Sequence, residues 1–178
     1  MIRKAFVAAS LLLVLTGCVS APPLNFAVDG VQASAHKLDA DLRATSVSYA
    51  SPAEKTGDLP SDGEAVPQLW QSALQEGLNR ATLFDDDSSN KVNLLVKIME
   101  LDVPAGGVTM TTTSMARYQL VSRKTGKVLY QKDIAAIGEV PPGYAFSGLV
   151  RIKESINRAV QNNIREFLSS MDTATLAH

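Results

Sequence analysis

Hydrophobic and polar residues alternate along much of this chain with a period of two, which is the pattern of half-buried β-strands. Residues 38–49 alternate with one slip of phase, which indicates a strand that contains a bulge. Gly126 lies in the short polar stretch 122–127 and predicts a tight hairpin turn. The three longer alternating runs, which we expect to be neighbouring strands, are 91–103, 109–121 and 127–140.

Two other segments have the 3.6-residue period of amphipathic helices. The first begins near Pro67, a favourable residue for a first helical turn, and follows a turn-rich loop at 51–63. Its apolar stripe consists of Leu69, Trp70, Ala73, Leu74, Gly77, Leu78 and Ala81. Gly77 lowers helix propensity by about 1 kcal/mol relative to alanine, so we expect it to allow close approach to the sheet. The second helix is predicted over 149–171, with Leu149 among its buried residues.

The predicted elements therefore follow the order β-α-β-β-β-α. Helices that are segregated from a run of strands favour the α+β class. We expect an antiparallel four-stranded sheet with two helices packed on one face.

The N-terminus has a different composition from the rest of the chain. Arg3 and Lys4 precede an apolar segment, 5–15, which is too short to span a bilayer and is typical of a secretory signal. It ends in Leu15, Thr16, Gly17 and Cys18, which resembles the lipobox of bacterial lipoproteins. This is the only cysteine in the chain, so an intramolecular disulfide is impossible. The alternative interpretation is an incidental cysteine. The position of Cys18 directly after the apolar segment disfavours this alternative.

The lipobox resemblance implies diacylglycerol transfer to the Cys18 thiol, cleavage after Gly17 and acylation, for example by palmitate, of the new amino group. Two or three acyl chains hold a protein on a membrane stably. Val19, where inner-membrane lipoproteins tend to have Asp, implies outer-membrane sorting with the domain on the periplasmic face of the cell envelope. We thus expect a signal peptide at 1–17, the lipidated cysteine and a flexible tether at 18–36, and one domain at 37–178.

Part of the tether has a second interpretation. Leu24, Phe26 and Val28 alternate, so this part could instead lie on the domain as an edge strand.

Charge and composition exclude several functions. The chain has 17 basic and 18 acidic residues, and the two basic residues of the signal leave a mildly acidic mature chain. This balance gives no footprint for nucleic acid. Asp85 and Asp87 imitate the start of a calcium loop, but Asn90 and Val96 stand where an EF-hand needs Gly and Glu. We therefore expect no metal and no cofactor.

Behind the lipobox, the order of elements resembles the YajG-like family of small outer-membrane lipoproteins. The residues that carry the resemblance are KVNLLVKIMELDV, RKTGKVLY and SINRAVQNNIREFL. At the level of the fold, the chain is also similar to LptE-type and TolB amino-terminal-type domains, which are adaptors without catalysis. The resemblance implies architecture more than activity.

Catalytic groups are scarce in the sequence. The two histidines, His36 and His178, lie in the expected tether and at the terminus, where geometry is poorly held. The chain has no G-x-S-x-G elbow, no glycine-rich phosphate loop and no hexapeptide repeat. We therefore expect no catalytic residue and a non-catalytic binding or assembly module with an envelope protein partner. The alternatives are an envelope enzyme, such as an acyltransferase acting on nucleotide-sugar or lipid precursors, and a simple spacer.

Three features are candidates for a partner surface. Tyr144 and Phe146 could form a contact patch, although a plug at the end of the core is favoured over it. Arg158 and Asn162 could belong to a polar face on the last helix, for which ordinary solvation is the default. The threonine-rich run 109–115 could be an exposed edge that accepts a partner strand, but a solvated face is favoured.

Overall fold

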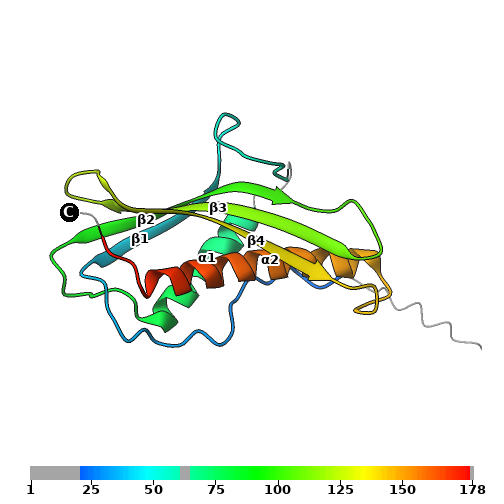
Figure 1. Cartoon of the computed structure of the whole chain (residues 1–178), viewed down its shortest axis with the longest axis horizontal. Helices are drawn as coiled ribbons and strands as arrows, with labels where there is room; N and C mark the ends of the chain where they lie inside the picture. Colours follow the sequence, from blue (N-terminus) through cyan, green and yellow to red (C-terminus); the bar gives the residue numbers. More distant parts are fainter. Residues whose placement is uncertain (1–20, 61–64, 177–178) are drawn as a thin grey trace, which may run out of the picture.

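The structure, a computed structural model, describes residues 21–60 and 65–176. Figure 1 shows the strands as one curved layer with both helices beneath it, which confirms the α+β class with a four-stranded sheet and two helices. The elements in chain order are β1 (Asp41–Tyr49), α1 (Ala65–Ala81), β2 (Lys91–Asp102), β3 (Met110–Ser122), β4 (Val128–Val140) and α2 (Gly148–Met171).

The sheet is mixed, so the prediction of a purely antiparallel sheet is wrong. The strand order is β1-β2-β3-β4, and β1 pairs with β2 in parallel while the other two pairs are antiparallel. The reason lies in α1, because a helix between two strands returns the chain to the end of the sheet where it started. The bulge expected in the first strand is present as a register shift between Leu42 and Ala44. Gly126 has the predicted positive φ, 72°, in the hairpin between β3 and β4.

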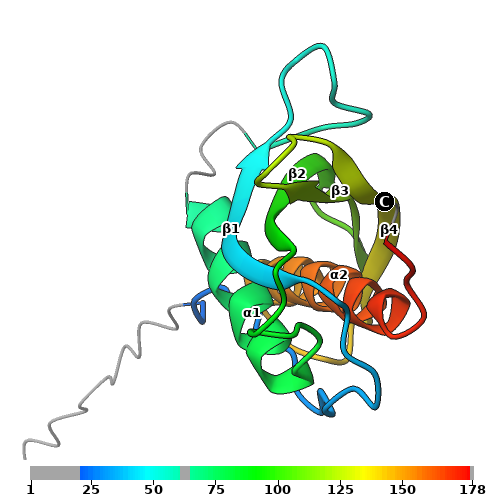
Figure 2. The ribbon, with the colours of Figure 1, turned by 90° about the vertical axis from the view of Figure 1, so that its left-hand side faces the viewer.

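Both helices cover the same face of the sheet, as the end-on view in Figure 2 shows. The stripe of α1 is buried as predicted except at Leu69, which is 37% exposed, while Val66 takes a buried place. Gly77 permits a close approach, but its neighbour is α2 and not the sheet. A Cβ at Gly77 would lie 2.9 Å from Cδ1 of Leu168.

Aromatic side chains from different parts of the chain form the centre of the core. The ring of Tyr118 on β3 stacks on Phe167 of α2, with ring centres 4.1 Å apart. The rings of Phe26 and of Trp70 on α1 pack edge to face, with ring centres 6.5 Å apart. The structure therefore closes the space between sheet and helices with residues from β3, both helices and the N-terminal segment.

The described part of the expected tether lies on the domain, so the prediction of a flexible segment up to residue 36 is wrong there. Phe26 and Val28 are 2% and 3% exposed and belong to the core. The segment does not form an edge strand, since none of residues 21–36 is assigned to a strand. Side chains of the helices hold it instead, with Asn157 accepting from the amide of Asn25 at 2.9 Å.

The outer face of the sheet, opposite the helices, is partly covered by loop 51–60. Glu54 in this loop forms an ion pair with Lys97 of β2. Thr56 donates a hydrogen bond to the Met115 sulfur at 3.4 Å. The loop rises above the sheet in Figure 1.

Side chains of the helices occupy backbone groups of the outermost strands. On β4, the carbonyl of Glu139 accepts from Arg158 at 2.8 Å and the carbonyl of Ile137 accepts from Asn162 at 2.9 Å. On β1, the backbone amide of Val47 donates to the side-chain oxygen of Gln71 on α1 at 3.3 Å. These contacts lock the helices to the two edges of the sheet.

Candidate functional site

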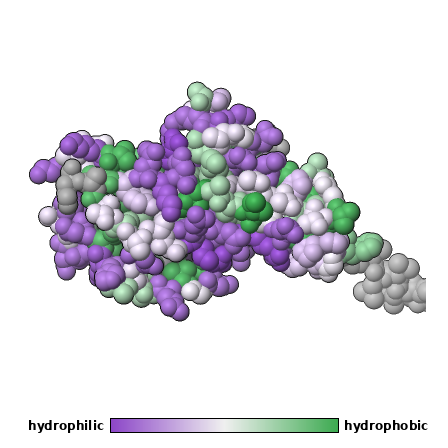
Figure 3. Space-filling model, in the orientation of Figure 1, coloured by the Kyte–Doolittle hydropathy of each residue, from purple (hydrophilic) through white to green (hydrophobic). Residues whose placement is uncertain are grey.

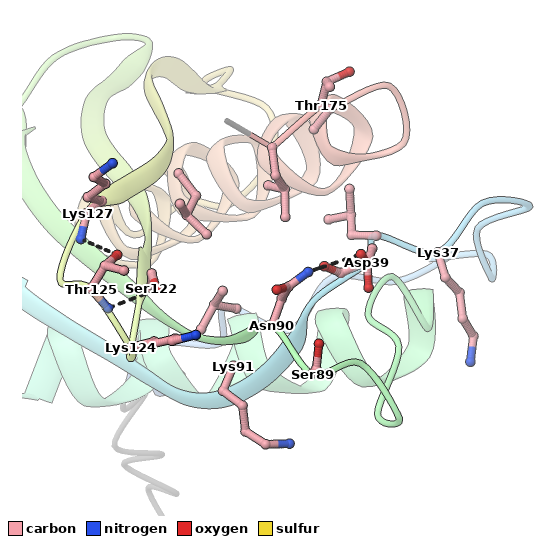
Figure 4. A pocket seen from close by; sticks show the side chains of 15 residues that line it. Lys37, Asp39, Ser89, Asn90, Lys91, Ser122, Lys124, Thr125, Lys127 and Thr175 are labelled. Carbon is pink, nitrogen blue, oxygen red and sulfur yellow. Dashed lines mark hydrogen bonds between the residues drawn. The ribbon is translucent and has the colours of Figure 1, made fainter. Parts of the chain in front are cut away.

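A cleft of about 500 Å³ lies at one end of the sheet. It lies where β2 begins, β3 ends and β4 begins, and the residues after α2 close one side of it. We call it the end cleft, and Figure 4 shows it from close by. The antiparallel pairing of β2, β3 and β4 brings these ends together although they are far apart in the sequence.

The floor of the end cleft is apolar. It is formed by Leu38, Val92, Leu129 and Leu176. Val92 is fully buried, whereas Leu129 and Leu176 are partly exposed and pack against the core. An apolar floor that remains open to solvent favours the binding of a ligand with an apolar part.

Four lysines line the same cleft: Lys37, Lys91, Lys124 and Lys127. Lys91 is already paired with Asp41, with its Nζ 2.6 Å from Oδ2. This ammonium group lowers the pKa of the Asp41 carboxyl below its ordinary value, which keeps the pair charged. The other three lysines have no side-chain partner within the described residues, so their charges are available to a ligand.

The carboxylate of Asp39 in the end cleft is occupied by neighbouring side chains. It accepts from the Ser88 hydroxyl at 2.7 Å and from the Asn90 amide at 3.0 Å. Figure 4 shows Asn90 pointing to Asp39, while Lys37 and Lys91 extend away from the centre of the cleft. Asp39 is the one acidic side chain among the described residues that line the cleft, and its oxygens already have hydrogen-bond donors. Because four lysines line the same cleft, the balance of charge among these residues is positive.

The turn between β3 and β4 fixes the position of Lys124. The Ser122 amide donates to the Lys127 carbonyl at 2.9 Å, and the Thr125 amide donates to the Ser122 hydroxyl at 3.3 Å. The backbone on which Lys124 stands is thus well defined, while its side chain has the freedom to meet an anion.

The polar groups of the end cleft are those that bind anions and hydrogen-bond partners. Its polar side chains are ammonium, hydroxyl and amide groups together with Asp39. Across residues 21–60 and 65–176, no group of three or more His, Cys, Asp or Glu side chains is arranged to hold a metal ion. His36 is exposed, and its backbone carbonyl, not its imidazole, accepts the hydrogen bond of Ser34.

The predicted lipobox and the cysteine predicted to carry lipid lie outside the described part of the chain. They are Leu15, Thr16, Gly17 and Cys18. The described chain starts at Ala21, three residues after the cysteine. Over the described residues, no helix has the length and apolar character needed to cross a bilayer.

The four residues of the predicted partner surface divide into two groups. Tyr144 is 48% exposed and Phe146 is fully exposed, so the favoured interpretation of a plug in the core is wrong. Arg158 and Asn162 bind carbonyls of β4 and are used within the molecule. The structure brings Arg158 and Tyr144 together, with the guanidinium carbon 5.2 Å from the ring centre.

The threonine-rich run lies in β3, which is an interior strand of the sheet. Both of its neighbours, β2 and β4, are hydrogen-bonded to it, so it is not an edge that accepts a partner strand. Thr112 points into the core and shares a 2.7 Å hydrogen bond with Ser155 of α2. Thr111, by contrast, is exposed, as the favoured interpretation of a solvated face requires.

Sequence reasoning missed the lysines of the end cleft. They are scattered over about ninety residues of the chain. The available signal was the basic hairpin SRKTGK next to the basic start of the strand KVNLLV. Two neighbouring antiparallel strands run in opposite directions. The end of one strand therefore lies beside the start of the strand before it.

Comparison with known proteins shows the fold but no family. No family model matches the chain, and no curated protein matches it. Protein XCC0632 from Xanthomonas campestris, a DUF330 protein, is similar in structure with a TM-score of 0.55 and 10% identity, over 84% of this chain and 91% of that one. At such low identity, the likeness shows a shared fold and no more.

Another solved structure is more distant. The minor lipoprotein from Acinetobacter baumannii has a TM-score of 0.47 and 10% identity, over 79% of this chain and 96% of that one. The resemblance to YajG-like, LptE-type and TolB amino-terminal-type proteins stays a prediction.

Proposed function

We propose that this chain is a lipid-anchored, non-catalytic binding module of the bacterial cell envelope. Cys18 carries the anchor, and the domain stands on the periplasmic face of the outer membrane. The end cleft receives a partner that presents an acidic group beside apolar ones. The single observation that carries the binding role is the end cleft itself, with an apolar floor and, in its lining, the two lysines of the turn between β3 and β4, Lys124 and Lys127.

The chemistry of the cleft supports this partner class. Burial of apolar surface against Leu129 and Leu176 contributes about 25 cal/mol per Å², and an ammonium group adds attraction for a carboxylate or phosphate. Lysine side chains on flexible stems adapt to anions at different positions. The surface therefore selects charge and apolar character and does not require one fixed shape.

Metabolic labelling tests the anchor. Cells that express the chain are grown with radioactive palmitate, and the wild type is compared with Cys18→Ala. We expect label in the wild type alone, together with recovery of the wild type in the outer-membrane fraction. Equal labelling of both, or none in either, would overturn the anchor.

A fluorescent fatty acid tests the end cleft, because it combines a carboxylate with an apolar chain. Wild-type protein should bind dansyl-undecanoic acid saturably, and the double variant Lys124→Glu, Lys127→Glu should bind it roughly tenfold more weakly. Lys55→Glu is the matched control, since Lys55 lies in loop 51–60 away from the cleft and loses the same type of charge. Equal binding by all three proteins would contradict the proposed site.

The acyltransferase alternative predicts turnover. Transfer of an acyl group from a thioester donor to a sugar or lipid acceptor, abolished by one polar substitution in the cleft, would replace the binding module with an enzyme. A spacer predicts that the cleft variants change no envelope property.

A further inference from the structure

Four hydrophobic side chains are exposed at the end of the molecule opposite to the end cleft. Val108 is 74% exposed, Phe146 is fully exposed, Leu149 is 56% exposed and Tyr144 is 48% exposed. We call this group the apolar tip. Figure 3 shows hydrophobic residues at the right-hand end of the surface, where the loops beyond β2 and β4 lie in Figure 1. Exposed apolar groups of this kind, gathered in one place, mark interaction sites.

Hydrogen bonds hold the segments of the apolar tip together. Arg151 donates from its guanidinium to the carbonyl of Val108, which ties the loop before β3 to the first turn of α2. The amide of Arg151 donates to the Ser147 carbonyl at 3.3 Å. Phe146 precedes this serine directly and Leu149 follows it by two residues. The segments that carry Val108, Phe146 and Leu149 are therefore held in a fixed arrangement.

The N-terminal segment runs toward the same end. The Asn25 carbonyl accepts from Gln161 at 2.9 Å, the Asn25 amide donates to Asn157, and Leu24 lines a hollow with Ile156. Moving back along the chain, each contact lies closer to the start of α2. Ala21 is three residues from Cys18, and three extended residues span at most about 11 Å.

We propose that the apolar tip inserts into the interface of the bilayer to which Cys18 is anchored. The inference rests on the proposed lipidation of Cys18. A short connection restricts the domain to a few orientations, and the end next to the anchor presents aromatic and aliphatic side chains to the lipid. Tyrosine has an apolar ring and a polar hydroxyl, which suits it to the boundary between acyl chains and headgroups.

The orientation places the end cleft on the periplasmic side. The cleft and the apolar tip lie at opposite ends of β3, which has 13 residues and is therefore roughly 40 Å long. The partner of the cleft is thus expected to approach from the periplasm, not from the bilayer that holds the anchor.

Fluorescence quenching in vesicles tests the inference. The lipidated mature protein is reconstituted into phosphatidylethanolamine–phosphatidylglycerol vesicles, in which the acyl chains are either brominated or not. Phe146→Trp places a fluorophore in the apolar tip, and Val128→Trp places one at the start of β4 near the end cleft, where Val128 is 46% exposed. The native Trp70 is fully buried in the core and provides the background.

We expect the added fluorescence of Phe146→Trp to fall about twofold in brominated vesicles, whereas Val128→Trp and the wild type stay unchanged. Leu149→Trp is a second variant that should behave like Phe146→Trp. Flotation of the wild type with the vesicles is measured in the same samples. Failure to float would overturn the lipid anchor, whereas flotation without quenching at position 146, or with equal quenching at 128, would overturn the orientation alone.

Discussion

The hydroxyl of Tyr118 on β3 donates a 2.8 Å hydrogen bond to the side-chain oxygen of Asn163 on α2, inside the core. The same hydroxyl accepts from the indole nitrogen of Trp70 on α1 at 3.3 Å. Burial raises the pKa of Tyr118 far above its ordinary value, so the phenol keeps its proton and remains a donor. One hydroxyl group thus connects the sheet to both helices.

Tyr118→Phe should lower the free energy of unfolding by about 1–3 kcal/mol, because Asn163 and Trp70 each lose a buried partner. The measurement is urea unfolding followed by the fluorescence of Trp70. Tyr130→Phe is the control, since the Tyr130 hydroxyl contacts Ser170 in a partly exposed place where water can replace it. Equal losses for the two variants would contradict the role of the Tyr118 network.

Phe26→Ala should destabilise the domain by about 3–5 kcal/mol, because it removes a buried aromatic ring that packs on Trp70. Phe146→Ala, which removes the same ring from a fully exposed place, should change stability by less than about 0.5 kcal/mol. Thermal unfolding of both variants checks the contrast. If Phe26→Ala were as mild as Phe146→Ala, the N-terminal segment would be a tether after all.

Gly138→Ala should destabilise the protein at the upper end of the roughly 1–3 kcal/mol typical of overpacking. An added Cβ would overlap the carbonyl of Ser155 and the amide of Ala159, and a backbone cannot rotate away as a side chain can. Gly143→Ala is the control because nothing lies within 4 Å of a Cβ at that position. Denaturant unfolding compares the two, and similar midpoints would show that α2 and β4 have room to separate.

Acidification should weaken the contact between loop 51–60 and the sheet. The hydrogen bond from Lys97, with help from Ser51, lowers the pKa of Glu54 to about 2. Because this pKa is lower in the folded state, the stabilisation is complete above about pH 4.5 and is lost as the pH falls toward 2. NMR titration of the Glu54 carboxyl carbon measures the midpoint. An ordinary midpoint near 4.3, or an unchanged loop transition in Glu54→Gln, would contradict this ion pair.

Much of the architecture could be predicted, because the spacing of apolar residues within a single helix or strand matches the residues that are buried there. The hairpin with Gly126 and the stripe of α1 are examples, and each depends on contacts that the local pattern already encodes. The direction of β1 could not be read in this way, since alternation is the same in parallel and antiparallel strands. The packing of Phe26 depends on Trp70 of α1, a distant residue that the N-terminal segment itself does not specify.

The candidate site was harder to predict than the fold. The lysines of the end cleft meet only after β2, β3 and β4 are paired. Arg158 and Asn162 have the composition of a recognition surface, but the carbonyls they bind lie on a strand some twenty residues away in the sequence. Phe146 was expected to plug the end of the core and is instead fully exposed, because an aromatic residue in a loop does not by itself show which way its ring points.

The hydrogen bonds from Arg158 and Asn162 to the outermost strand have a consequence for a protein held on a membrane by the proposed anchor. Proteins on a membrane meet often and in similar orientations. An exposed edge strand could then pair with the same strand of a neighbouring copy. Here the helix already fills the positions at Glu139 and Ile137 to which a neighbouring copy would bind. Pairing between neighbouring copies is thus hindered at the C-terminal end of β4, even at high surface density.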